Sequence, residues 1–378
     1  MRSRTIGLLG LGTVGQALVS IIQKSYPEVH IVKALVRDVH LRRTVSVPLT
    51  TRPEEVWTDP DIDLVVEVMG GREPRPWVLE ALQAGKDVVT ANKELMAYHG
   101  PELLAAAHES GRQLLYEAAV AGGIPILDGL AQHLSVVPIQ RIEGVLNGTS
   151  NFILSHMEHG APYAAALAEA QRLGYAEADP TADVRGDDTA RKILLLARIG
   201  FHLDADPETV DTVGITALHD RHLARLKTFR LGLRLVGSAW LDQGRVSLMV
   251  APTVYRIPHP FLGLEGPGNA IKVISEAGTF WFQGPGAGGY ATATSILSDI
   301  IRIGHQGTAL ENPRHPPYAT RAAAPFYITF TEDSDRRLPL GLPGEIRRVG
   351  SYAIVEPGYS KEALEEYGLC QFVWGEAE

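Results

Sequence analysis

A glycine-rich turn near the start of the chain restricts its possible folds most. Residues 5–9, Thr-Ile-Gly-Leu-Leu, have the pattern of a short buried strand and run directly into a Gly-x-Gly-x-x-Gly segment. Residues 16–23 follow with the spacing of an amphipathic helix. Glycines in such a turn permit close approach of a pyrophosphate, which the helix N-terminus attracts. The expected cofactor-binding residues here are Gly10, Gly12, Thr13, Val14 and Gly15.

Further strands are predicted over residues 31–36, 64–68, 87–89 and 113–116, with a helix around 77–84. This alternation is typical of a parallel sheet in a Rossmann-like nucleotide-binding domain. Polar residues follow the strands, at the edge where open parallel sheets bind ligands. Candidates at this edge are Arg37, Gly70, Lys93 and Glu117. A loop lysine is often merely solvated, so Lys93 has both interpretations.

The end of the second strand bears on the choice of cofactor. Asp38 in that position would favour NAD, whereas Arg37 would favour the 2′-phosphate of NADP. Arg42 and Arg43 lie close by, although each also fits a solvated charge cluster. We therefore expect NADP, with NAD as an alternative.

A second domain is expected to begin near residue 139, where period-two patterning resumes over 139–146. Strands over 230–240 and 246–255 flank an Asp-Gln-Gly turn, which predicts a mainly antiparallel sheet in an α+β domain. A second glycine-rich loop, containing Gly286 and Gly288, precedes a helix over 291–303 and could approach the cofactor. We expect domains at 1–138 and 139–300, a helix returning to the first domain at 301–320, and a short appendage at 321–378.

Composition narrows the class of protein. The chain has 378 residues, 45% hydrophobic content and a net charge of −9, which fits a globular protein and argues against a nucleic-acid partner. No apolar run of membrane length occurs, so no membrane partner is expected. A single cysteine, Cys370, rules out a disulfide framework within the chain and favours a cytoplasmic location.

Residues 174–192 concentrate carboxylates and a lysine immediately before an apolar run. Pro180 and Gly186 interrupt regular structure, and Asp187 or Asp188 is a suitable helix N-cap. Asp188 and Lys192 then share one face of the first helical turn. Such a pair is often an ordinary surface ion pair. The apolar helix that follows favours instead a lysine at the edge of a cleft.

Other chemistries lack their motifs. The sequence has no His-Glu-x-x-His, Cys-x-x-Cys or Gly-x-Ser-x-Gly pattern, and Cys370 lies in the terminal appendage. Among the reactions considered, hydride transfer to a carbonyl group, assisted by a lysine, is the one that the motifs still allow. The small-residue loop over 117–126 could present carbonyl oxygens and Glu117 to a hard cation, or it could be a tight packing turn.

These motifs together resemble the homoserine dehydrogenases of the monofunctional bacterial type. The resemblance covers residues 5–320 and rests on the glycine turn and on the segments 90–93, 117–125, 147–151, 174–192 and 284–288. It implies NAD(P)-dependent interconversion of L-homoserine and L-aspartate 4-semialdehyde in threonine and methionine biosynthesis. Many members end in a regulatory ACT domain, but the tail from residue 325 is too short for a full one.

The resemblance also implies roles for individual residues. Lys192 would be the general acid/base, Asp188 would orient it, and Lys93 would lie between nicotinamide and substrate. The expected substrate-binding residues are Glu177, which would meet the ammonium group, with Asp183, Gly148, Thr149 and Tyr175. Gly174, Gly286 and Gly288 would touch the cofactor. The family's sodium ion would be held by Glu117, Val120, Gly122 and Ile124, and a homodimer would form through the antiparallel sheet.

Two other functions fit parts of this pattern. A dinucleotide-binding sensor could keep the first domain without catalysis, but it would not need Asp188, Lys192 and Lys93. A related amino-acid semialdehyde dehydrogenase would share the chemistry. Glu177 predicts that the substrate carries an ammonium group.

Overall fold

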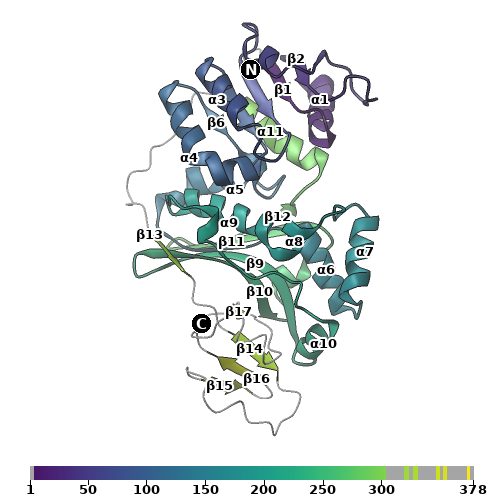
Figure 1. Cartoon of the computed structure of the whole chain (residues 1–378). Helices are drawn as coiled ribbons and strands as arrows, with labels where there is room; N and C mark the ends of the chain where they lie inside the picture. The colour runs from purple at the N-terminus through teal and green to yellow at the C-terminus, as the bar shows by residue number, and fades with distance from the viewer. Residues whose placement is uncertain are drawn as a thin grey trace. The chain divides into compact units, whose positions relative to one another are not determined.

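The structure is a computed structural model that describes residues 4–303 and five short strands after them, at 319–322, 327–330, 346–349, 352–355 and 373–374. The chain forms two compact units (Figure 1). Unit 1 comprises Met1–Ile142, Leu194–Pro207 and Lys272–Ala319. Unit 2 comprises Glu143–Ile193, Glu208–Ile271 and Thr320–Glu378. Cys370 lies outside the described residues, as does most of the expected appendage.

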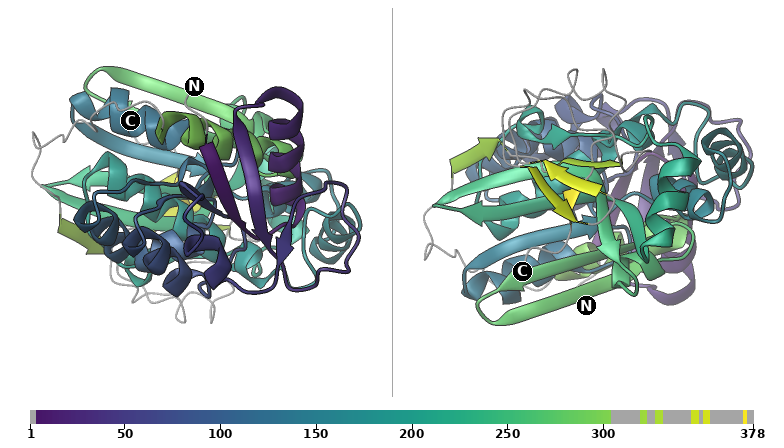
Figure 2. Two further views of the ribbon diagram at one scale, coloured as in Figure 1. Left: turned by 90° about the horizontal axis from the view of Figure 1, so that it is seen from above. Right: turned by 90° about the horizontal axis from the view of Figure 1, so that it is seen from below.

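Unit 1 contains the expected Rossmann-like sheet, whose N-terminal strands are purple in Figure 2. It is a 6-stranded parallel sheet of order β3-β2-β1-β4-β5-β6. Its strands are β1 (Arg4–Leu9), β2 (Val29–Leu35), β3 (Leu49–Thr50), β4 (Leu64–Glu67), β5 (Asp87–Thr90) and β6 (Leu114–Leu115). The accompanying helices are α1 (Thr13–Ser25), α2 (Glu54–Trp57), α3 (Arg75–Gln83), α4 (Lys93–Glu109), α5 (Ile126–Asp128) and α11 (Gly289–Ile303). The strand order reverses between β1 and β4, and such a switch point is where this kind of sheet binds nucleotides.

Helix α11 packs against α1 in unit 1 (Figure 1). Its buried residues Ala293, Ile296 and Ile300 join the same apolar core as Leu18 and Ile22 of α1. Helix α11 therefore belongs to unit 1, whereas the boundaries expected from the sequence place residues 139–300 in the second domain. The physical reason is that the apolar face of α11 completes the core of the nucleotide-binding sheet. Residues 304–318 of the expected returning segment lie outside the described residues.

Helix α4 contains Pro101 and needs a substitute for one hydrogen bond. Proline has no N–H, so the carbonyl of Ala97, four residues earlier, loses its helical donor. Arg198 replaces it, because its Nη2 donates to the Ala97 carbonyl at 2.8 Å and its Nη1 donates to the Met96 carbonyl at 2.7 Å. Arg198 therefore holds the interior of α4 together.

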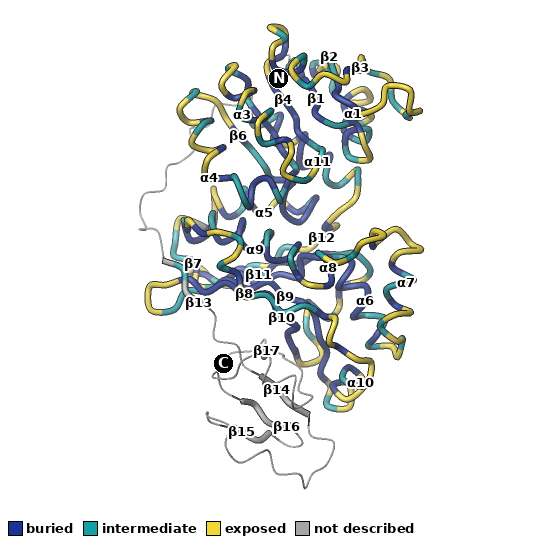
Figure 3. Tube along the Cα trace, viewed as in Figure 1, coloured by how far each residue is buried: buried dark blue, intermediate teal, exposed yellow. Residues whose placement is uncertain are grey.

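The second sheet is mainly antiparallel, as expected, and its two longest strands, β9 and β10, belong to unit 2. The 8-stranded sheet has the order β12-β11-β7-β9-β10-β13, and two short strands, β8 (Asp211–Thr212) and β17 (Val373–Trp374), also pair with β10. The strands on the main path are β7 (Ile139–Val145), β9 (Leu231–Asp242), β10 (Arg245–Arg256), β11 (Gly268–Ser275), β12 (Gly278–Pro285) and β13 (Ala319–Ala322). β9 and β10 form a long antiparallel hairpin that is buried over most of its length (Figure 3).

The helices of unit 2 are α6 (Gly148–Glu158), α7 (Tyr163–Arg172), α8 (Thr181–Arg185), α10 (Asp220–Thr228) and the first half of α9 (Asp187–Gly200). The C-terminal strands β14 (Tyr327–Phe330), β15 (Ile346–Val349) and β16 (Tyr352–Val355) form a separate 3-stranded sheet. Within the described part of the chain, no helix is long and apolar enough to cross a membrane.

Candidate active site

Helix α9 brings the expected lysine and carboxylate together. The helix begins at Asp187, so Asp187 and Asp188 lie in its first turn, and the expectation that one of them is the N-cap is wrong. Gly186 precedes them with φ of 91°, a left-handed conformation that glycine adopts readily. Asp188 Oδ2 lies 2.8 Å from Lys192 Nζ. The side chains are only 5% and 10% exposed, so this is a buried pair rather than a surface ion pair.

Asn147 adds a contact that the sequence did not indicate. Its Nδ2 donates to Asp183 Oδ1 at 2.7 Å and to Asp188 Oδ2 at 2.9 Å. Asn147 is also the N-cap of α6, because its Oδ1 accepts from the Ser150 N–H at 2.8 Å. Its second role depends on carboxylates 36 and 41 residues away, which no local pattern brings together.

The backbone carbonyl of Leu146 orients the lysine. Lys192 Nζ donates to it at 2.6 Å, and Asn269 Nδ2 donates to the same oxygen at 2.9 Å. Lys192 therefore has two fixed acceptors, the Leu146 carbonyl and Asp188 Oδ2, both buried. A buried ammonium held in this way is preorganised for a reacting oxygen.

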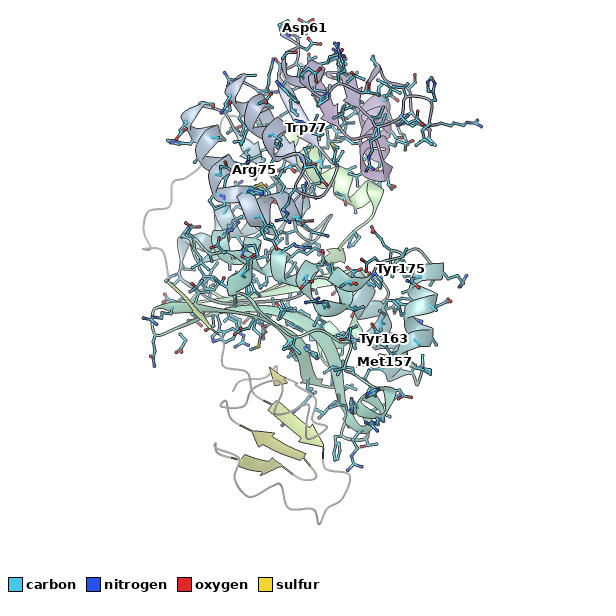
Figure 4. The ribbon with its side chains drawn as sticks, viewed as in Figure 1. Asp61, Arg75, Trp77, Met157, Tyr163 and Tyr175 are labelled. Carbon is cyan, nitrogen blue, oxygen red and sulfur yellow. The ribbon has the colours of Figure 1, made fainter. Side chains whose placement is uncertain are left out.

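Of the expected substrate-binding residues, Thr149 and Tyr175 are joined directly, because the Thr149 hydroxyl donates to the Tyr175 carbonyl at 2.5 Å. Tyr175 follows α7 and is 39% exposed (Figure 4). Gly148 must be glycine, since a Cβ there would lie 2.8 Å from Pro267 Cα. Gly174 has φ of 77° just after the end of α7. Glu177 is exposed on the turn that follows, where its carbonyl accepts from Gln171 Nε2.

The glycine turn of unit 1 has the geometry of a phosphate cradle. Gly10 has φ of 103°, and a Cβ on Gly15 would lie 2.6 Å from the Gly10 carbonyl oxygen. Gly12 is the N-cap residue of α1, and a Cβ there would meet nothing within 4 Å. Thr13 and Val14 form the first turn of α1, where no side chain caps the backbone N–H groups. The open N-terminus suits a pyrophosphate.

Glu67, at the end of β4, is another residue that the sequence did not single out. Its carboxylate is fully buried and accepts from the backbone N–H groups of Met69 at 2.7 Å and Gly70 at 3.4 Å. The Thr90 hydroxyl and Asn92 Nδ2 also donate to it. Burial raises the pKa of Glu67, and these hydrogen bonds oppose the rise.

Asn92 extends this network to Lys93. Asn92 Nδ2 donates to the Gly71 carbonyl at 2.7 Å, and its Oδ1 accepts from the Leu95 N–H at 3.0 Å. It is therefore the N-cap of α4, whose first residue is Lys93. Gly70 and Lys93, both expected at the cofactor, are held on one network at the carboxyl edge of the sheet.

Arg37 lies exposed just after β2. The loop that follows is ordered by Arg43, whose Nη1 donates to the Leu41 carbonyl at 2.8 Å and whose Nη2 donates to the Asp38 carbonyl at 2.9 Å. Both terminal nitrogens of the Arg43 guanidinium therefore bind backbone carbonyls of its own loop. Arg37 lies at the carboxyl edge of the parallel sheet, two residues after the end of β2.

The loop after β6 is buried and tightly turned. Ala121 and Gly122 both have φ of 53°, and Ser295 Oγ donates to the Gly122 carbonyl at 2.7 Å. A Cβ on Gly122 would lie 2.8 Å from the backbone of Gly286, so these two expected site residues are neighbours. Gly288, with φ of 115°, directly precedes α11. Val120 and Ile124 are buried.

Glu117 begins this loop with its carboxylate already engaged. The carboxylate accepts from the N–H groups of Leu127 at 2.9 Å and Asp128 at 2.8 Å. Burial raises the pKa of Glu117 to about 7, and the hydrogen bonds oppose it. Among residues 4–303 and the short strands, no group of three or more His, Cys, Asp or Glu side chains could hold a metal ion.

The parallel sheet with its open glycine turn and the buried lysine–carboxylate pair define an NAD(P)-binding oxidoreductase. Residues 10–117 match the family described as the NAD-binding domain of homoserine dehydrogenase, and residues 125–301 match the homoserine dehydrogenase family. The chain belongs to the homoserine dehydrogenase family.

Individual proteins similar to this chain are also homoserine dehydrogenases. The chain is 43% identical to homoserine dehydrogenase of Bacillus subtilis over 335 residues, which cover 83% of this chain and 77% of the relative. A homoserine dehydrogenase structure from Thiobacillus denitrificans is similar with a TM-score of 0.80 and 36% identity, covering 87% and 83% of the two chains. A hyperthermophilic archaeal homoserine dehydrogenase in complex with NADPH has a TM-score of 0.68 and 28% identity, covering 80% and 98%.

Proposed function

We propose that this enzyme interconverts L-homoserine and L-aspartate 4-semialdehyde, as a step of threonine and methionine biosynthesis, with Lys192 as general acid/base. The observation that carries the role of Lys192 is its buried pairing with Asp188 at 2.8 Å. Reduction of an aldehyde builds negative charge on its oxygen, and a fixed ammonium stabilises that charge and donates the proton. In the reverse direction the neutral lysine accepts the hydroxyl proton. A bound nicotinamide supplies or accepts the hydride.

The carboxylates near Lys192 support an amino-acid substrate. Asp183 and Asp188 both accept from Asn147 Nδ2, so two carboxylates lie together beside the lysine. A carboxylate is a strong acceptor for an ammonium group such as that of an amino acid. We propose that Asp183 and Glu177 meet this group and that Gly148, Thr149 and Tyr175 line the same pocket.

We propose NADP as the preferred cofactor, with NAD also used. The glycine turn would hold the pyrophosphate, and Gly70, Lys93, Gly174, Gly286 and Gly288 would line the rest of the cofactor site. The exposed guanidinium of Arg37 at the end of β2 supports contact with the 2′-phosphate. The related archaeal structure in complex with NADPH is consistent with this choice.

We also propose a structural sodium ion at the loop containing Glu117, Val120, Gly122 and Ile124. The backbone turns sharply at the successive left-handed residues Ala121 and Gly122, and carbonyl oxygens are ligands that suit a hard cation. We propose that most of the ligands are backbone carbonyl oxygens of this loop. Thermal unfolding in NaCl against choline chloride tests this, since a bound ion raises the unfolding temperature.

A homodimer formed through the antiparallel sheet and a cytoplasmic location complete the proposal. The exposed Trp281 on the edge strand β12 supports an association through the sheet. The single cysteine supports a reducing compartment. Sedimentation of the purified protein tests the dimer.

The boundaries at 138, 300 and 320 remain a prediction about domains, which limited proteolysis tests.

The decisive experiment is homoserine-dependent reduction of NADP and of NAD by the purified protein, followed by nicotinamide absorbance, beside a Lys192→Ala variant. Activity that disappears in the variant supports both substrate and site. Nucleotide binding without any turnover would replace this proposal with a sensor. Turnover only with another amino-acid alcohol would replace the substrate.

A further inference from the structure

We infer that Asn147 is a positioning residue that fixes Asp183 and Asp188 around Lys192 and thereby sets the geometry of proton transfer. The inference rests on the proposed function of Lys192. Asn147 contacts neither the reacting atoms nor the lysine in the network described above, so its effect on the reaction passes through the two carboxylates.

Both amide hydrogens of Asn147 and its amide oxygen make hydrogen bonds. The residue is only 4% exposed, and its Oδ1 accepts from the Ser150 N–H at 2.8 Å. Its Nδ2 has two hydrogens, and it donates to Asp183 at 2.7 Å and to Asp188 at 2.9 Å. Two carboxylates held this close repel each other unless donors compensate them. The single amide supplies a donor to each.

Asn147 and Lys192 share an acceptor, which ties the amide to the lysine. Asp188 Oδ2 accepts from Asn147 Nδ2 at 2.9 Å and lies 2.8 Å from Lys192 Nζ. The lysine also donates to the carbonyl of Leu146, the residue next to Asn147. The end of β7 therefore fixes the ammonium through its backbone and fixes the ammonium's partner through the Asn147 side chain.

A purely structural role as the N-cap of α6 is the alternative, and substitution can separate the two. In Asn147→Ser the hydroxyl still caps the helix, because serine is an equally good N-cap residue, but it is too short to reach both carboxylates. In Asn147→Asp the cap is also kept, while the donor becomes a third carboxylate. A cap role predicts nearly normal activity in Asn147→Ser, whereas the added charge in Asn147→Asp disturbs the two carboxylates under either role.

A positioning role predicts loss in both. We expect kcat to fall by about 10²-fold in Asn147→Ser, the scale of a misplaced catalytic group, and further in Asn147→Asp. KM for the nucleotide should stay unchanged. Counting active sites by nucleotide binding removes any contribution from unfolded protein.

Lys192→Ala, measured in parallel, separates failure of the inference from failure of the proposed function. Normal kcat in Asn147→Ser, with an inactive Lys192→Ala, would overturn the role of Asn147 and leave the proposed function standing. Full activity in Lys192→Ala would overturn both. If Asn147→Ser does not fold, an Asn147→Asp variant that folds and keeps normal kcat overturns the inference equally.

Discussion

Asp188 Oδ2 and Lys192 Nζ lie 2.8 Å apart, one turn apart on α9, with both side chains buried. Surface pairs with this spacing contribute little, whereas a buried pair is sensitive to the loss of either partner. Burial and the hydrogen bond to the Leu146 carbonyl hold Lys192 in one position beside Asp188, which is what the role proposed for this lysine requires.

Replacing the ammonium should stop the reaction without emptying the nucleotide site. We expect Lys192→Ala to lower kcat by about 10²- to 10⁴-fold, the usual contribution of a general acid/base, with nucleotide affinity nearly unchanged. Lys192→Arg is the matched control, because it keeps a cation that does not release its proton. Nucleotide titration by fluorescence and steady-state kinetics measure the two effects. An equal loss of nucleotide affinity would contradict the assigned role.

Arg37→Ala should weaken NADP more than NAD. Loss of one contact to the 2′-phosphate predicts about a tenfold rise in KM for NADP, equivalent to ~1.4 kcal/mol, with KM for NAD nearly constant. Arg52→Ala is a suitable control for net charge, because Arg52 is 66% exposed in the same unit and pairs with Glu54 and Glu55. A parallel rise for both cofactors would show that Arg37 does not contact the phosphate.

Arg198→Met should destabilise unit 1 by about 2–4 kcal/mol, because buried carbonyls of α4 lose charged donors. In a Pro101→Ala background the same change should lower the free energy of unfolding less, because the alanine N–H can donate to the Ala97 carbonyl. Urea unfolding of the four proteins forms a double-mutant cycle. An identical effect in both backgrounds would mean that Arg198 does not substitute for the missing helical bond.

The buried carboxylate of Glu67 predicts a pH dependence of stability. Burial raises its pKa in the folded state, so its contribution to stability is fully present below pH 4.5 and is lost as pH rises through the folded pKa. Each unit of pKa elevation corresponds to ~1.4 kcal/mol. Glu67→Gln removes this loss, so relative to wild type it should gain stability between pH 5 and pH 8. Urea unfolding at both pH values measures the difference, and a constant difference would refute the prediction.

Local sequence was sufficient for features set by neighbouring residues. The strand, the glycine turn from Gly10 to Gly15 and helix α1 are found where the pattern predicts them, because the turn needs those backbone conformations. The spacing of Asp188 and Lys192 likewise fixes them on one face of a helix. What the sequence determined was the class of fold and the pair of charges.

Tertiary structure decided which partners those charges meet. Asn147 reaches Asp183 and Asp188 only because β7 ends beside α8 and α9, and α11 joins unit 1 only because its apolar face completes a core begun nearly 300 residues earlier. Glu67 gains four donors from the end of β5 and from the loops after β4 and β5, which the parallel pairing of these strands brings together. Hydrogen bonds and apolar contacts between distant segments leave no periodic trace in the sequence, so only the folded chain reveals them.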